Sequence, residues 1–147
     1  MGRMLTPQRR RGRLRGWTFI ETLIVIGIVL ILTSAVGFMA FKYLDQAKQA
    51  TAKSQIETLA LALNAYYFDC KKLPATEQGL SVLWTKPAGV DGWNGPYVAK
   101  AIPKDPWGGD YQLKVPGPNG LPFEIISLGA DHAPGGTGQD ADLSSAQ

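Results

Sequence analysis

The chain has 147 residues, a single cysteine, 45% hydrophobic residues and a formal net charge of +3. The single cysteine excludes an intrachain disulfide, and the absence of a phosphate-binding loop and of a credible nucleophile–base pair argues against an enzyme. All six arginines precede residue 16, so the later part carries nine lysines against twelve acidic residues, a net charge of −3. The basic charge therefore indicates membrane topology, and no nucleic-acid partner is expected.

An apolar segment of 25 residues, 17–41, follows the arginine-rich residues 9–15 and Gly16. As a helix it would be about 37 Å long, more than the roughly 30 Å of a bilayer's hydrocarbon layer. It predicts a transmembrane helix whose arginine-rich side stays in the cytoplasm. A secretory signal peptide would have a shorter apolar region with its small-residue site after it, whereas Gly16 comes before it. A plain membrane anchor would account for the basic residues and the apolar segment but not for Glu21, because a carboxylate within lipid costs about 2–3 kcal/mol.

Residues 16–21, Gly-Trp-Thr-Phe-Ile-Glu, resemble the processing motif of type IV pilins and pseudopilins. The resemblance implies that prepilin peptidase removes residues 1–16 as a basic leader, cutting after Gly16. It also implies methylation of the new N-terminus at Trp17 and a role for Glu21 in assembly. A buried carboxylate needs a partner, and a cation of a neighbouring subunit would supply it as helices pack into a filament.

The helix is expected to continue beyond the membrane. No Gly or Pro occurs in residues 41–68, and apolar residues recur at steps of three and four from Ile56 to Tyr66 and Tyr67. This spacing predicts one helix of roughly 50 residues with an apolar face from Ile56 to Phe68. Residues 42–147 are long enough for one small head domain under which the second half of the helix packs.

Residues 69–74 should end the helix, since Pro74 biases the residue before it away from helical geometry. Residues 75–83 then predict a short helix. Thr76 is expected to cap it, with Leu80 and Leu83 facing the long helix.

The remainder is predicted to consist of loops and short strands. Residues 86–97 should be irregular, with Trp84 and Trp93 covering the core rather than stacking on a ligand. Residues 111–115 and 123–127 flank the turn Pro-Gly-Pro-Asn-Gly and predict an antiparallel hairpin. A hairpin against the apolar face of the long helix gives an α+β fold.

Two further segments, 72–83 (KLPATEQGLSVL) and 102–112 (IPKDPWGGDYQ), resemble the major pseudopilins of type II secretion systems. The resemblance implies a type IV pilin-like fold, with a long N-terminal helix, transmembrane in its first half, packed against a small antiparallel sheet. It implies a single-pass protein of the bacterial inner membrane whose head lies in the periplasm. The implied partners are further copies of the chain, minor pseudopilins, prepilin peptidase, the inner-membrane assembly platform and membrane lipid. Two alternatives stay open: a type IV pilin forming a surface fibre, and a membrane-anchored periplasmic binding domain with Trp93, Trp107 and the tyrosines in its groove.

The C-terminal residues 127–143 contain three aspartates among glycines and prolines that disfavour a helix or strand. Crowded carboxylates in a flexible backbone fit Ca²⁺, which takes six to eight oxygen ligands. Zinc would require more than the one histidine, and the spacing of an EF-hand is absent. The pattern alone leaves a solvated acidic tail equally open.

The same segment resembles the calcium-binding loop of the major pseudopilins. The resemblance implies that Asp131 is the first side-chain ligand, that Leu128 supplies a backbone carbonyl, and that Asp140 and Asp142 are the later carboxylates. In a chain without a disulfide, bound calcium would stabilise the folded loop by mass action.

Overall fold

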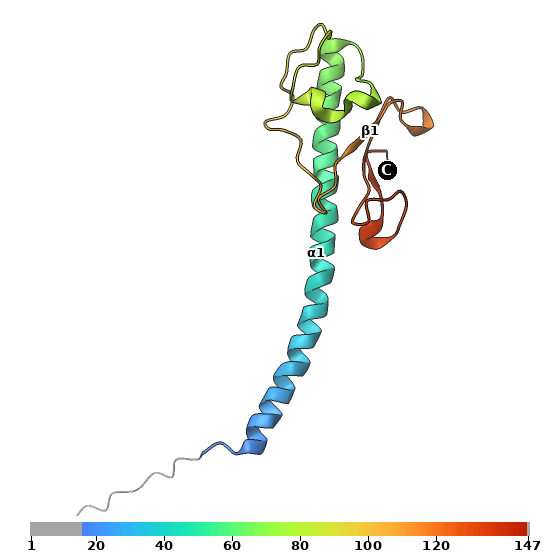
Figure 1. Cartoon of the computed structure of the whole chain (residues 1–147). Coiled ribbons are helices and arrows are strands. Elements are labelled where there is room, and N and C mark those ends of the chain that lie inside the picture. The colour runs from blue at the N-terminus through green and yellow to red at the C-terminus, as the bar shows by residue number, and fades with distance from the viewer. Residues whose placement is uncertain (1–15, 147) are drawn as a thin grey trace, which may run out of the picture. The chain divides into compact units, whose positions relative to one another are not determined.

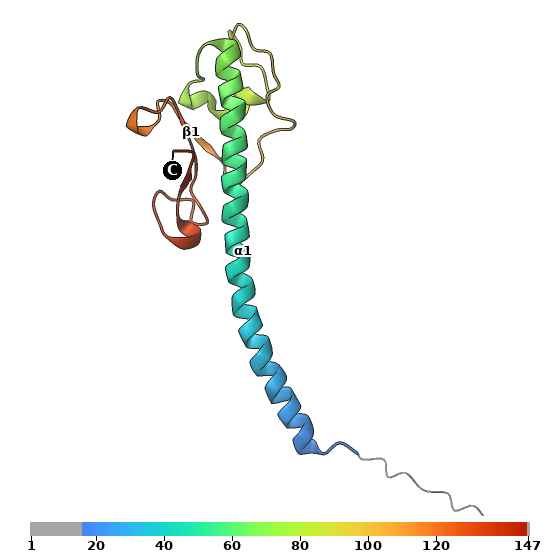
Figure 2. The same ribbon diagram turned by 180° about the vertical axis from the view of Figure 1, so that it is seen from behind.

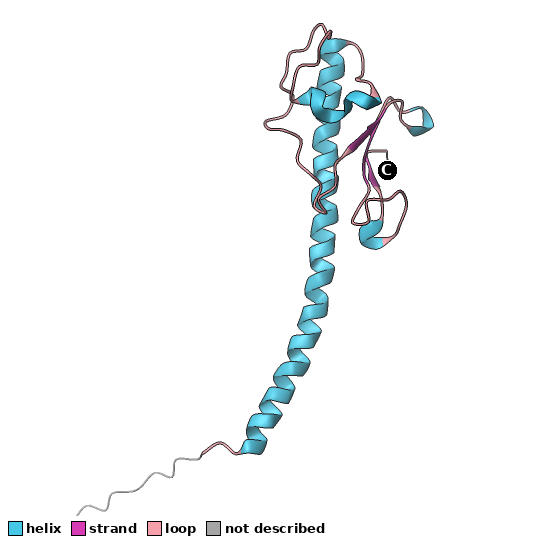
Figure 3. Cartoon of the chain, in the orientation of Figure 1, coloured by secondary structure: helices cyan, strands magenta, loops and turns pink. Residues whose placement is uncertain are grey.

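The computed structural model describes residues 16–146, apart from the side chains of residues 35–39. The chain divides into two compact units, Met1–Ala40 and Phe41–Gln147. The elements in chain order are α1 (Phe19–Cys70), η1 (Thr76–Leu83), β1 (Gln112–Lys114), η2 (Pro118–Gly120), β2 (Glu124–Ser127), η3 (Gly138–Asp140) and β3 (Leu143–Ser144) (Figure 1). The η elements are short 3₁₀ helices. Apart from α1, loops join short elements throughout the second unit (Figure 3).

The predicted long helix is confirmed as α1, with 52 residues. It begins where the hydroxyl of Thr18 accepts the backbone N–H of Glu21 at 3.3 Å, which satisfies one of the free donors of the first turn. It ends where Lys71 adopts a left-handed conformation with φ of 55°, a common way for a helix to stop. Pro74 lies three residues further on and prevents a restart.

The first unit carries its apolar side chains on the outside. Twelve large apolar residues are between 42% and 81% exposed: Trp17, Phe19, Ile20, Leu23, Ile24, Val25, Ile26, Ile28, Val29, Leu30, Ile31 and Leu32. Within the residues that the structure describes, which exclude the side chains of 35–39, no helix is both long and apolar enough to cross a membrane.

The second unit is built around the apolar face of α1 that its helical spacing predicted. The core residues on this face are Ile56, Leu59, Ala62, Leu63 and Tyr66, and the other core residues are Leu80, Val82, Leu83, Val90, Tyr111, Leu113 and Ile125. Burying a side chain such as Leu63, which is 0% exposed, contributes about 1.5–3 kcal/mol. The prediction extended this face too far, because Tyr67 is 46% and Phe68 is 68% exposed. Each residue turns about 100° around a helix, so these two point away from the direction of Tyr66.

The sheet has three antiparallel strands in the order β1-β2-β3. The predicted hairpin is confirmed by β1 and β2, with Leu113 opposite Ile125. The third strand was not predicted, because β3 is two residues long and lies in a segment read as loop. It pairs Leu143 with Ser127 at the end of β2. The sheet and the C-terminal loop lie beside the second half of α1 (Figures 1 and 2), so the α+β class is confirmed.

The predicted short helix is a 3₁₀ helix, η1, interrupted at Gly79 with φ of 60°. Leu80 and Leu83 are buried as expected. Thr76 was wrongly expected to be the cap, since its hydroxyl instead accepts the backbone N–H of Val115 at 3.1 Å. The position of the cap is taken by Ala75.

The two tryptophans expected to cover the core, Trp84 and Trp93, differ in whether they are buried against it. Trp93 packs against the core, and its indole N–H donates to the carbonyl of Val82 at 2.9 Å. Trp84 is 41% exposed, so this part of the prediction was wrong. Trp84 follows the last turn of η1, where no periodicity determines on which side a side chain lies.

Candidate functional site

The residues predicted for processing and assembly meet at the start of α1. Gly16, Trp17, Thr18 and Glu21 line one surface hollow. Gly16 and Trp17 are exposed and precede the helix in irregular backbone, which leaves the peptide bond between them open to a protease. Glu21 is exposed in the first turn, where the helix dipole favours a negative charge. The capping role of Thr18 was missed in the sequence, although the Thr-x-x-Glu spacing is its usual signal.

The acidic loop connects β2 to β3 and folds back on itself. The backbone N–H of Ala130 donates to the carbonyl of Gln139 at 3.0 Å, which joins the two arms of the loop. A hydrogen bond ties the loop to the helix: the side-chain amide of Gln49 donates to the carbonyl of Gly138 at 2.8 Å. The loop is therefore held at its arms and against α1.

Asp142 lies in the return arm of this loop. Its backbone N–H donates to the carbonyl of Gly135 at 3.2 Å, and its Oδ2 accepts the N–H of Gly135 at 3.0 Å. The second carboxylate oxygen, Oδ1, is buried and has no hydrogen-bond partner among the described residues. A buried acceptor without a donor costs about 1–3 kcal/mol, and more when it is charged.

The other predicted ligands lie nearer the surface. Asp131 is exposed, and its Oδ1 accepts the N–H of Ala133 at 3.0 Å. Asp140 is also exposed, and Leu128 is half-buried. In the described part of the chain, no three His, Cys, Asp or Glu side chains come together as a metal site. A metal would therefore depend on backbone oxygens as well as carboxylates.

The donor set nevertheless has the chemistry that calcium prefers. A Cβ placed on Gly129 would lie 2.7 Å from the carbonyl oxygen of Gln139 and 3.1 Å from that of Ala141. Two backbone carbonyls of the return arm thus come close to Gly129 in the first arm of the loop. Neutral carbonyls combined with a carboxylate are typical calcium ligands.

One of the tryptophans proposed for a binding groove, Trp93, packs inside the fold together with tyrosines. The Tyr97 ring packs edge-on against Tyr66 and Trp93, with ring centroids 5.7 and 5.8 Å apart. The Tyr97 hydroxyl donates to Asp69 at 2.8 Å. Burial raises the pKa of Tyr97 to about 12. The pKa of Tyr111 also rises to about 12, first through burial and then through the nearby charge of Asp105.

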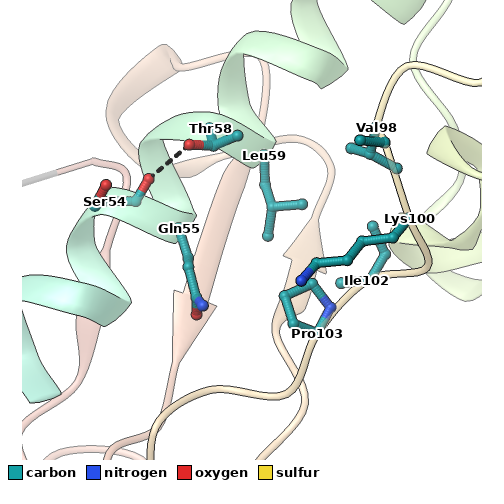
Figure 4. Close-up of a pocket in the computed structure, with 9 residues that line it drawn as sticks. Ser54, Gln55, Thr58, Leu59, Val98, Lys100, Ile102 and Pro103 are labelled. Atoms are coloured by element: carbon teal, nitrogen blue, oxygen red, sulfur yellow. Dashed lines mark hydrogen bonds between the residues drawn. The ribbon is translucent and has the colours of Figure 1, made fainter.

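A separate groove of about 270 Å³ lies between α1 and the loop of residues 98–103 (Figure 4). Its lining is Ser54, Gln55, Thr58, Leu59, Val98, Ala99, Lys100, Ile102 and Pro103. The surface is mainly apolar, and Lys100 carries its one charge. None of the site residues predicted from the sequence lies in this groove.

Comparison with known proteins identifies the family. Residues 39–146 match the family described as "Type II secretion system (T2SS), protein G". The chain is similar to the type II secretion system core protein G of Pseudomonas aeruginosa, with 41% identity over 137 residues that cover 91% of this chain and 96% of that protein. The corresponding protein of Xanthomonas campestris pv. campestris is 38% identical over 141 residues, which cover 96% of each chain.

A solved structure shows the same likeness. The major pseudopilin from the type 2 secretion system of enterohaemorrhagic Escherichia coli aligns with a TM-score of 0.60 and 33% identity. The alignment covers 69% of this chain and 84% of that one. The chain therefore belongs to the type II secretion system protein G family, the major pseudopilins, and is a structural subunit rather than an enzyme.

Proposed function

We propose that the chain is made as an inner-membrane precursor, cleaved between Gly16 and Trp17 by prepilin peptidase, and polymerised into a periplasmic pseudopilus that drives protein export. In this proposal residues 1–16 are the leader, residues 17–41 form the membrane and filament-core helix, and residues 42–147 form the periplasmic head. The observation that carries the proposal is the continuous exposure of large apolar side chains along the start of α1.

These side chains need an apolar environment that the chain itself does not provide within its described residues. Twelve of them between Trp17 and Leu32 are more than 40% exposed, and fully burying one contributes about 1.5–3 kcal/mol. Before assembly, membrane lipid would cover this surface. In the filament, the same surface would pack against the helices of other copies, in contacts that repeat from subunit to subunit and so extend without closing.

Glu21 would select the register in which neighbouring helices pack. Cleavage after Gly16 would create an amine at Trp17, four residues before the exposed Glu21. Within lipid or a filament core, a lone carboxylate costs more than one paired with a cation. A subunit whose amine meets the Glu21 of its neighbour is therefore favoured over other registers. Minor pseudopilins and the inner-membrane assembly platform are the proposed further partners.

Mass spectrometry of the mature protein tests the processing step. The expected species begins at Trp17 and carries one methyl group. Gly16→Val should accumulate uncleaved precursor, because the branched side chain obstructs a tight protease site. Gly27→Ala, a change into open space within α1, should be processed normally. A mature pool that retains Met1 would contradict the proposal.

We also propose that the acidic loop binds calcium. Asp131, Asp140 and Asp142, which the structure does not hold together as one cluster, would provide carboxylates once the ion draws them in, and Leu128 would provide a backbone carbonyl. The support comes from the buried, unpartnered Oδ1 of Asp142 and from the carbonyl oxygens beside Gly129. Calcium bound in the loop would supply positive charge to that oxygen and join the two arms.

Thermal unfolding of the full-length protein in detergent tests the calcium proposal. After chelation, calcium at 100 times its dissociation constant should stabilise the fold by about 2.7 kcal/mol. Asp142→Asn should remove this response while leaving the calcium-free protein at least as stable, because an uncompensated charge is lost. Asp110→Asn is the control, since its side chain is 82% exposed and lies outside the loop. An unchanged melting temperature of the unmodified protein on adding calcium would refute the site.

A further inference from the structure

Two buried polar side chains contact each other at the base of the acidic loop. Among the described residues, Asp105 and Ser127 are the buried polar side chains, with 5% and 0% exposure. The Ser127 hydroxyl donates to Oδ2 of Asp105 at 2.6 Å. A buried carboxylate is costly unless hydrogen bonds compensate it, so the surroundings of Asp105 indicate what it supports.

The other oxygen of Asp105 closes a turn of residues 105–109. Oδ1 accepts the backbone N–H of Trp107 at 3.0 Å and that of Gly109 at 2.7 Å. The backbone N–H of Asp105 donates to the carbonyl of Gly109 at 2.9 Å. Oδ1 and the backbone thus complete the 105–109 turn, and Oδ2 remains for the contact with Ser127.

Ser127 places this contact next to the proposed ligands. It is the last residue of β2, and its oxygen accepts the N–H of Gly129 at 3.4 Å. Leu128, a proposed carbonyl ligand, lies between these two residues. The contact therefore spans the point where the strand becomes the loop.

The 105–109 turn touches the loop a second time. A Cβ added to Gly109 would lie 2.8 Å from Nδ1 of His132, so the His132 ring lies directly on this glycine. His132 follows Asp131 in the chain. The turn therefore contacts the loop on both sides of the segment from Leu128 to Asp131.

We propose that the 105–109 turn is a clamp that positions the first arm of the calcium loop, with Asp105 and Ser127 as positioning residues that do not touch the metal. The inference rests on the calcium site proposed above. The clamp holds the backbone carbonyl of Leu128 and the side chain of Asp131 in place before the ion arrives. Loss of such outer contacts typically lowers metal affinity by about 10–100-fold.

Calcium titration by calorimetry tests the clamp in the full-length protein in detergent. Ser127→Ala removes the link to Asp105 and leaves every proposed ligand in place, so the dissociation constant should rise at least about tenfold. Ser145→Ala is the matched control, because its hydroxyl accepts the N–H of Ile125 at 2.9 Å, elsewhere on β2. Its dissociation constant should stay within about twofold. Equal calcium affinity in the two variants would reduce Asp105 and Ser127 to a purely structural role.

Hydrogen exchange in calcium-free protein separates this inference from the calcium proposal. Ser127→Ala should speed exchange of the amides of residues 128–133 more than Ser145→Ala does. If the unmodified protein binds no calcium, the metal site is refuted and the exchange result decides the clamp alone. Equal exchange in that segment in both variants would overturn the clamp.

Discussion

Gly136 offers a sharp test of how tightly the acidic loop is packed. Its φ is +81°, and a Cβ there would lie 2.3 Å from the carbonyl oxygen of Asp140 and 2.9 Å from the Asp140 Cβ. The nearest obstacle is backbone, which cannot rotate aside. In Gly136→Ala, the left-handed conformation costs about 1–2 kcal/mol, and the overlap adds about 1–3 kcal/mol as the loop shifts.

Gly138→Ala separates these two costs. Gly138 also has a positive φ, +66°, but a Cβ there meets nothing within 4 Å, so only the conformational cost applies. The two variants should therefore differ by about 1–3 kcal/mol in the free energy of unfolding. For a unit of this size the difference corresponds to roughly 4–12 °C in Tm.

Thermal unfolding of the full-length proteins in detergent, followed by near-ultraviolet circular dichroism, measures this difference. Gly136→Ala should melt below Gly138→Ala, and it should also lose the calcium response. Equal melting temperatures in the two variants would show that the loop backbone is not held as closely as the structure indicates.

Three further predictions follow from burial, titration and assembly. Leu63→Ala should lower the free energy of unfolding by about 2–5 kcal/mol, because Leu63 is 0% exposed. Leu61→Ala, at a site that is 72% exposed, should change the free energy of unfolding by no more than about 0.5 kcal/mol. Urea unfolding of both variants measures these changes. The pKa of Tyr111 is about 12 in the folded protein against 10.0 ordinarily, so the unfolded chain loses this proton at lower pH than the folded protein does. The free energy of unfolding should therefore be retained below pH 10 and fall as pH rises toward 12. Tyr111→Phe should flatten that fall in urea unfolding measured across this pH range. Glu21→Ala should be cleaved normally but form no filaments in electron micrographs. Glu57→Ala, at an exposed site later in α1, is the control and should assemble. Filaments of normal length from Glu21→Ala would refute the pairing of Glu21.

Periodicity and turn residues were sufficient to predict the long helix and the first hairpin of this protein. The long helix, its buried face from Ile56 to Tyr66, and the hairpin of β1 and β2 all follow from local spacing. These features are readable because the alternation of apolar and polar residues along a helix or strand reflects which side is buried. The family resemblance likewise rests on short contiguous motifs.

Several of the wrong predictions concern features that depend on contacts between residues far apart in the chain. Thr76 bonds to Val115 rather than capping its own helix, and the two-residue strand β3 exists only because the end of β2 offers it partners. The exposure of Trp84 depends on where the chain turns after η1. Local propensity contains none of this information.

The sequence by itself determined that a long helix carries an apolar first half and a charged site at its start, because hydrophobicity and charge are properties of contiguous residues. Only the tertiary structure decided which oxygens of the acidic loop come together and that Asp105 supports that loop through Ser127. Those contacts join residues far apart in the chain, and their strength depends on burial that forms only when the head has folded.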